Sequence, residues 1–223
     1  MKNLFIVTSA LNPSFGAIDL QERFDKTLDT IESIRKKDPE CLIFLIDGSP
    51  RPIEEDKIKI LKPKVDYLIY LGNHSTMQEL TASRQKSAAE AYLLISALKS
   101  LKFSATPPIK RIWKVTGRGT VMDEFDITAF DDDSVKDKYV FKKRVRSWMH
   151  PALELVDTRF WSFDYSLIDE TIDLLSICFN DCLTSGWDIE HVIFKHINKS
   201  KLVEWDRVWF TCALGSTGEI VYD

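Results

Sequence analysis

Three acidic side chains stand where they could take part in binding or catalysis. Asp47 directly follows the apolar run 41–46, and it could accept hydrogen bonds from a nucleobase or a ribose hydroxyl, or simply cap the turn after the run. Asp157 and Arg159 alternate along a predicted strand and therefore share one face, where such a pair is either structural or catalytic. Glu190 opens a predicted short helix, either as a general base for a hydroxyl or as an acid favoured by the helix dipole.

Basic side chains accompany these acids. Arg23 lies beside the apolar face of a predicted helix, from which a guanidinium could fork onto a phosphate or point into solvent. Lys86 and Glu90 are four residues apart and share a helix face, which gives at least a surface pair worth about 0.2–0.5 kcal/mol. The neighbouring Ala88-Ala89 favours close packing of this turn.

Two charged runs are weaker candidates for a site. Asp131-Asp132-Asp133 resembles a metal cluster, but it lies in a polar run, whereas carboxylates that hold Mg²⁺ or Mn²⁺ need a rigid scaffold. The basic run 142–146 suits a strand with one solvated face, and an anionic sugar or a pyrophosphate could be its local partner. The cysteines lie in apolar surroundings without metal-ligand spacing, so we expect buried, reduced thiols and no protein metal site.

Several nucleotide and hydrolase motifs are absent from the sequence. It contains no G-x-x-x-x-G-K-[ST] loop, no Rossmann glycine fingerprint and no G-x-S-x-G elbow. These absences disfavour a P-loop enzyme, a dinucleotide-binding enzyme and an α/β-hydrolase. The missing glycine-rich first turn also disfavours a nucleotidyltransferase.

Residues 1–120 alternate short apolar runs with helical patterns. We predict strands at 4–9, 41–46, 67–71 and 109–116, and helices at 19–37, 53–61 and 77–101. Strands separated by helices of this length pair in parallel through right-handed crossovers, which gives a doubly wound α/β layer. Ligands of such sheets lie beyond the carboxyl ends of the strands, the edge where Ser9, Asp47, Gly72 and Gly117-Arg118 are expected.

Residues 121–223 have a different pattern. Strand-like segments at 139–148 and 153–163 suggest a hairpin, and a last strand is expected at 208–214. Helices are predicted at 166–183, with Ser166 and Asp169 as a capping-box variant, and at 189–197. Because no flexible linker separates the halves, we expect one mixed α/β domain over residues 1–223, with an antiparallel-rich second half.

Composition narrows the range of functions. The 223 residues include 30 Lys and Arg and 34 Asp and Glu, so the formal net charge is −4 and nucleic acid is not an expected partner. Hydrophobic residues make up 44%, which excludes global disorder. The longest apolar runs have about six residues, too few for a transmembrane segment, and no signal peptide is visible. We therefore expect a cytoplasmic protein.

In this order, the pieces of the sequence resemble nucleotide-sugar glycosyltransferases of the GT-A fold, in particular small bacterial and viral members. The Lys86–Ala91 and Ile112–Arg118 segments resemble the pattern K-G-x-x-E-A … F-K-x-S-G-R-Y. Further parts of the resemblance are Arg23-Phe24…Thr27-Leu28, the strand ending in Asp47, Asp157-Thr158-Arg159-Phe160 and the late Glu190-His191.

The resemblance implies a donor site and a base. It places the base and ribose of a nucleoside-diphosphate sugar near Thr8, Ser9 and Asp47. Arg23, Lys86 and Arg118 would face ribose or diphosphate, with Glu90 and Arg159 beside them, and Glu190, or less favourably Asp157, would deprotonate an acceptor hydroxyl. Residues 1–120 would then bind the nucleotide and residues 121–223 a glycan or other hydroxyl acceptor.

The sequence departs from this family at the end of its fourth predicted strand. Typical members have D-x-D there, which binds Mn²⁺ or Mg²⁺ on the diphosphate, whereas this chain has Thr116-Gly117-Arg118. Either Arg118 and Lys86 neutralise the leaving diphosphate without a metal, or the chain is a catalytically silent nucleotide- or glycan-binding protein with the same fold. A further alternative is a cofactor Mn²⁺ or Mg²⁺ that binds together with the nucleotide-sugar donor, since no residue of the chain is predicted as a metal ligand. Gly119 also replaces the tyrosine of the pattern.

Overall fold

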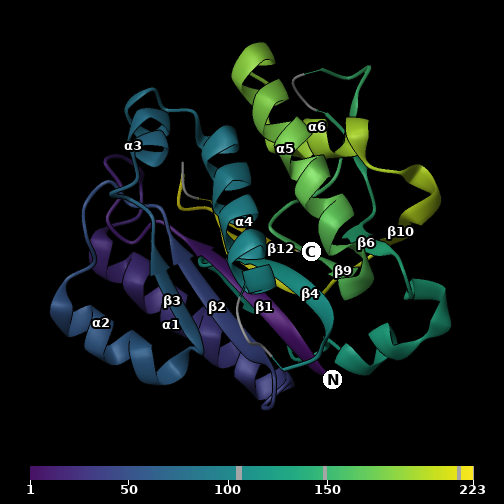
Figure 1. Ribbon diagram of the computed structural model, residues 1–223, viewed down its shortest axis with the longest axis horizontal. Coiled ribbons are helices and arrows are strands. Elements are labelled where there is room, and N and C mark those ends of the chain that lie inside the picture. Colours follow the sequence, from purple (N-terminus) through teal and green to yellow (C-terminus); the bar gives the residue numbers. More distant parts are fainter. Residues whose placement is uncertain (104–106, 148–149, 215–216, 223) are drawn as a thin grey trace.

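A seven-stranded sheet with helices on both faces forms the centre of the fold (Figure 1). The computed structural model describes residues 1–103, 107–147, 150–214 and 217–222. In spatial order the sheet contains β10 (Leu202–Trp205), β6 (Tyr139–Lys142), β9 (Phe160–Asp164), β4 (Ile109–Thr116), β1 (Lys2–Ser9), β2 (Leu42–Asp47) and β3 (Tyr67–Tyr70).

The pairing of these strands confirms the predicted sheet. β1 lies between β2 and β4 and is parallel to both, and β3 continues the parallel series beside β2. β9 is antiparallel to β4 and β6, and β10 is parallel to β6. The chain is therefore a single mixed α/β domain with a largely parallel, doubly wound sheet and an antiparallel part in its second half.

Alternation along the strands sends side chains to two cores. Leu4 and Ile6 of β1 pack in the core that also contains buried side chains of four helices, α3 (Ser75–Ala82), α4 (Lys86–Phe103), α5 (Ile168–Ser185) and α6 (Ile189–His196). Phe5 and Val7 pack in the opposite core with Phe24 of α1 (Leu20–Lys37). In Figure 1, α4 and α5 accordingly lie over one face of the sheet, and α1 lies behind it. Strands buried on both faces are typical of a parallel sheet, which explains the unbroken apolar runs.

The helices begin and end at recognisable signals. The Asp19 side chain caps α1 by accepting a hydrogen bond from the Glu22 N–H at 2.9 Å. α5 ends at Gly186, which adopts a left-handed conformation with φ 70°. The helices are α1 (Leu20–Lys37), α2 (Glu55–Leu61), α3 (Ser75–Ala82), α4 (Lys86–Phe103), α5 (Ile168–Ser185) and α6 (Ile189–His196). Short 3-10 turns occupy Lys62–Lys64, Ile127–Asp131, Asp133–Val135, Tyr165–Leu167 and Lys199–Lys201.

The prediction of one long helix over 77–101 is wrong, because the chain breaks between α3 and α4. Arg84 has φ 58°, the left-handed conformation that closes a helix. Its N–H donates to the Thr81 carbonyl at 3.2 Å, and the Gln85 N–H donates to the Leu80 carbonyl at 2.9 Å. These two bonds form a Schellman motif in which arginine stands where glycine is usual. Residues 82–86 contain no glycine or proline, so this break has no signal in the sequence.

The second half also differs from the predicted pattern. The expected hairpin is interrupted: β7 (Val145–Arg146) and β8 (Glu154–Leu155) form a separate small sheet, and Trp148 lies outside the described residues. Ser166 caps no helix. It lies in a 3-10 turn, where its N–H donates to the Asp164 carboxylate at 3.0 Å. Three further strands, β5 (Gly119–Val121), β10 and β12 (Ile220–Tyr222), were not predicted from the sequence. β5 and β12 flank β11 (Phe210–Ala213) in a three-stranded sheet.

The described part of the chain contains no helix that is both long enough and apolar enough to cross a membrane.

Candidate functional site

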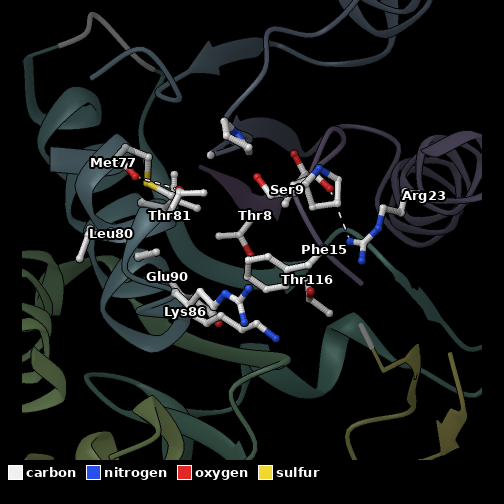
Figure 2. A pocket seen from close by; sticks show the side chains of 18 of the residues that line it. Thr8, Ser9, Phe15, Arg23, Met77, Leu80, Thr81, Lys86, Glu90 and Thr116 are labelled. Carbon is white, nitrogen blue, oxygen red and sulfur yellow. Dashed lines mark hydrogen bonds between the residues drawn. The ribbon is translucent and has the colours of Figure 1, made fainter. Parts of the chain in front are cut away.

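A cavity of about 350 Å³ lies at the carboxyl ends of β1, β2 and β4, the edge predicted for a ligand (Figure 2). Thr8 and Ser9 from β1 and Thr116 from the end of β4 form its floor. Lys86 and Glu90 come from the first turns of α4. Six of the predicted donor residues thus line one cavity: Thr8, Ser9, Arg23, Lys86, Glu90 and Arg118.

Four basic side chains converge on this cavity: Arg23, Arg84, Lys86 and Arg118. None of them forms an ion pair with an acidic side chain within the described residues. Arg23 is buried, and its Nε donates to the Ile18 carbonyl at 3.1 Å. Burial, followed by the positive charge of Arg118, lowers the pKa of Arg23. Like charges held together without counter-charges form a site that favours an anionic ligand.

Phe15 arranges two of these cations. It lies in the loop after β1 and lines the cavity (Figure 2). The Lys86 ammonium stands 4.9 Å and the Arg84 guanidinium carbon 5.5 Å from the centre of its ring. A ring face attracts cations at such distances. Arg84 and Phe15 were not predicted as site residues, because Arg84 is placed by the helix break and Phe15 by a loop without regular structure.

Asp47 lies beneath the cavity wall, where it holds the loops after β1 and β2. Its side chain is fully buried and does not line the cavity. It accepts hydrogen bonds from the Ser9 hydroxyl at 2.7 Å, the Leu11 N–H at 2.8 Å and the Ser49 N–H at 2.9 Å. Burial nevertheless raises the pKa of Asp47, against the hydrogen bonds from Ser49 and Ser9. The carboxylate oxygens of Asp47 thus connect the loops after β1 and β2. Asp47 therefore positions these loops and does not make the predicted nucleotide contact from the cavity wall.

A buried lysine of β4 is the main functional residue missed from the sequence. Lys114 has a side chain only 2% exposed, and it forms an ion pair with Glu90. Its ammonium also donates to the Thr158 carbonyl at 2.6 Å. Glu90 is therefore bound to a residue of the central strand, rather than forming the simple surface pair with Lys86. A signal existed, because a lysine within an apolar strand is rarely buried without a partner.

Glu190 joins the same network on the other side of Thr158. The Thr158 hydroxyl donates to Glu190 Oε1 at 2.9 Å. Burial, reinforced by the charge of Glu90, raises the pKa of Glu190 to about 7. A carboxyl group with such a pKa exchanges a proton readily at neutral pH, as a general base requires. The side chain is half-buried and is not part of the cavity lining.

Asp157 and Arg159 face a small separate recess beside Phe160 and Cys212. Arg159 Nε lies 2.8 Å from Asp157 Oδ1, so the predicted pair is present. Although burial acts to raise the pKa of Asp157, the hydrogen bonds and charge of Arg159 hold it below its usual range. This pair does not line the larger cavity, and Asp157 is a weaker base than Glu190.

The turn that carries Arg118 is fixed by α1 and by a close packing contact. The Thr27 hydroxyl donates to the Gly117 carbonyl at 2.8 Å. A Cβ atom on Gly119 would lie 1.9 Å from Cζ of Phe210, which explains why glycine stands there in place of tyrosine.

The acidic and basic runs do not form sites among the described residues. Asp131 pairs with Lys110, and no group of three potential metal ligands occurs in the described part of the chain. Glu90 is the one carboxylate that the described cavity lining contains, and it is paired with Lys114. This donor set does not fit a divalent ion held by the protein. In the basic run, Arg144 lies between Glu154 and Glu204.

Comparisons with known proteins support the fold. No family model matches the chain, and no curated protein matches it. A glycosyltransferase involved in the glycosylation of the major capsid of PBCV-1 is similar in structure, with a TM-score of 0.52 and 8% identity over 92% of this chain and 82% of that one. Core-mannan synthase A from Aspergillus fumigatus, solved in an Mn/GDP form, has a TM-score of 0.50 and 12% identity over 92% of this chain and 73% of that one. The chain thus has a GT-A-like fold.

Proposed function

We propose that the chain is a glycosyltransferase that takes its sugar from a nucleoside-diphosphate donor. The observation that carries this proposal is the convergence of Arg23, Arg84, Lys86 and Arg118 on one cavity without ion-pair partners among the described residues. A diphosphate would supply the missing negative charge, and arginine is suited to bidentate phosphate contacts. Residues 1–120 then form the donor half, and residues 121–223 supply the acceptor half.

The transfer needs a base and a stabilised leaving group. Glu190 would accept the proton of the acceptor hydroxyl while the hydroxyl oxygen of the acceptor bonds to the anomeric carbon of the donor sugar. The bond from that carbon to the diphosphate breaks, and its electron pair leaves with the nucleoside diphosphate. Lys86 and Arg118 would stabilise the charge that develops on the leaving group. Because the donor set does not fit a divalent ion, no step is assigned to one.

Thermal shifts test the donor site directly. UDP, GDP, CMP, ADP and TDP are added at millimolar concentration, each with and without Mn²⁺, since a ligand that binds the native state raises Tm. We expect one nucleotide to stabilise the chain selectively. Lys86→Met should weaken that binding about tenfold, the value of one modest charge-assisted contact. Lys36→Met, which removes an exposed lysine paired with Asp123, is the control. No shift with any nucleotide would refute the donor site.

A second candidate function has one observation in its favour. β4 ends in Thr116-Gly117-Arg118, without the carboxylates that hold a metal in typical enzymes of this fold. A catalytically silent nucleotide- or glycan-binding protein would retain the cationic cavity and lack turnover. Nucleotide binding without sugar transfer or donor hydrolysis across a broad panel of donors and acceptors would favour this second function.

A further inference from the structure

A second cavity, of about 830 Å³, lies between the small sheet of β7 and β8 and the helices α5 and α6. It shares no lining residue with the first cavity. Its volume falls within the range of about 300–1,000 Å³ that is usual for small-molecule sites. None of the residues that we place in the donor site or in catalysis lines it.

Two aromatic side chains of the α6 region, Trp187 and His191, line this cavity. Trp187 is 37% exposed, and its ring lies edge-on to that of His191, with 5.4 Å between centroids. The ring of His150 is stacked on Trp187 at 5.4 Å and 15°. The indole is thereby held in one orientation while part of it remains open to a ligand. A fixed, partly exposed tryptophan offers a large apolar surface at little entropic cost.

His191 supplies an independent indication of a ligand. Its side chain lines the cavity and is only 5% exposed, yet neither ring nitrogen has a hydrogen-bond partner among the described residues. Burial lowers the pKa of His191, which favours the neutral ring with one donor and one acceptor nitrogen. Buried polar atoms are almost always paired, and an unpaired one costs about 1–3 kcal/mol. A hydroxyl group can satisfy either nitrogen.

The charges around this cavity balance, in contrast to those of the first. Arg146 and Lys195 are its basic residues, and Glu154 and Asp181 its acidic ones. Lys195 is already paired with Asp181 at 2.8 Å. The lining residues therefore carry no net formal charge that would favour a phosphate or a strongly charged peptide, and their side chains offer hydrogen-bond donors and acceptors to hydroxyl groups.

We propose that this second cavity is a binding site for an uncharged saccharide, with Trp187 as the stacking surface and His191 as a hydrogen-bonding group. The apolar face of a sugar ring fits the indole, and its hydroxyls fit the surrounding polar groups. Residues 191, 194 and 195 share the face of α6 that lines the cavity, whereas the carboxylate of Glu190 bonds to Thr158 outside it. The site therefore holds a part of a glycan remote from any reacting hydroxyl, and it does not depend on donor binding.

Titration with neutral oligosaccharides tests this proposal. Saturation-transfer NMR and calorimetry are run with cellotetraose, maltotetraose, mannotetraose and chitotetraose, and with a uronic-acid tetrasaccharide as the charged comparison. We expect at least one neutral tetrasaccharide to bind more tightly than the charged one. Trp187→Ala should weaken that binding about tenfold or more, and Trp187→Phe should retain most of it. Phe103→Ala, which removes an aromatic ring 91% exposed at the end of α4, is the matched control.

The outcomes separate this site from the donor site. Glu190→Gln and Lys86→Met should leave saccharide binding unchanged, whatever they do to nucleotide binding or transfer. Absence of binding by every neutral saccharide, equal binding by Trp187→Ala, or preference for the uronic-acid ligand would each overturn the proposal. A chain that binds saccharide but no nucleotide would refute the proposed function and leave this inference standing.

Discussion

The substitution Glu190→Gln tests the central electrostatic feature of the site. Glutamine keeps the shape of the side chain and can still accept the hydrogen bond from Thr158, but it carries no charge. The pKa of Glu190 is raised from 4.5 to about 7 by burial and by the charge of Glu90. At 1.36 kcal/mol per pKa unit, this shift corresponds to at most about 3 kcal/mol.

The sign of the effect follows from proton binding. Between pH 4.5 and about 7 the folded protein holds a proton on Glu190 that the unfolded chain has lost. The stability of the wild-type protein therefore falls, relative to Glu190→Gln, as the pH rises through this window. We expect the two proteins to be equally stable near pH 4 and the variant to be more stable by up to about 3 kcal/mol at pH 8.

Chemical denaturation of both proteins at several pH values measures this difference. Glu40→Gln, which alters a side chain 86% exposed, is the control and should show no such trend. A stability difference that does not change with pH would refute the raised pKa. In the transfer assay, the wild-type rate should rise with pH through about 7. Glu190→Gln should lose transfer and keep nucleotide binding, and an active variant would remove Glu190 from the role of base.

Three further substitutions test the network and the turns around the first cavity. Lys114→Met leaves Glu90 unpaired and should destabilise the fold by about 2–3 kcal/mol, which is below the full cost of breaking a buried pair because Glu90 is 29% exposed. In denaturant melts, a double variant with Glu90→Gln should recover most of the lost stability, and no recovery would contradict the pairing. Arg84→Gly removes the backbone strain of an arginine in the left-handed conformation and should stabilise the fold by about 1 kcal/mol. The same substitution should weaken nucleotide binding in titrations, and unchanged affinity would exclude Arg84 from the donor site. Thr27→Val leaves the Gly117 carbonyl without its donor and should cost about 1–2 kcal/mol in unfolding free energy, and a neutral result would mean that this turn is held elsewhere.

The common position of some predicted donor residues followed from the order of the strands and helices in the sequence. Apolar runs alternating with helical patterns require parallel strands, and parallel strands bring their carboxyl ends to one edge. Ser9 and Arg118 were therefore placed together correctly although they are far apart in the chain. Arg23, Lys86 and Glu90 also face this cavity. Arg23 lies on α1, whose start was predicted within a few residues, whereas Lys86 and Glu90 lie on α4, whose start was hidden within a longer predicted helix.

The chemical state of these residues depended on the tertiary structure. Asp47 looked available at the end of its strand, but the loops after β1 and β2 close over it and occupy its oxygens. The pKa of Glu190 is set by burial and by Glu90, which is one hundred positions away in the chain. Lys114 acquires its role only because Glu90 and Thr158 meet it from other elements.

The amino-acid sequence by itself determined the four parallel strands of the first half and the edge at which their carboxyl ends meet, because hydrophobic periodicity is a local property. Only the tertiary structure decided which side chains are paired and which cations are left without partners, because burial and charge pairing join distant residues. The left-handed Arg84 and the cavity around Trp187 arise in the same way. Neither an arginine in a left-handed turn nor a single tryptophan has a periodic pattern in the sequence. The roles of Arg84 and Trp187 depend on the neighbours that the fold places beside them.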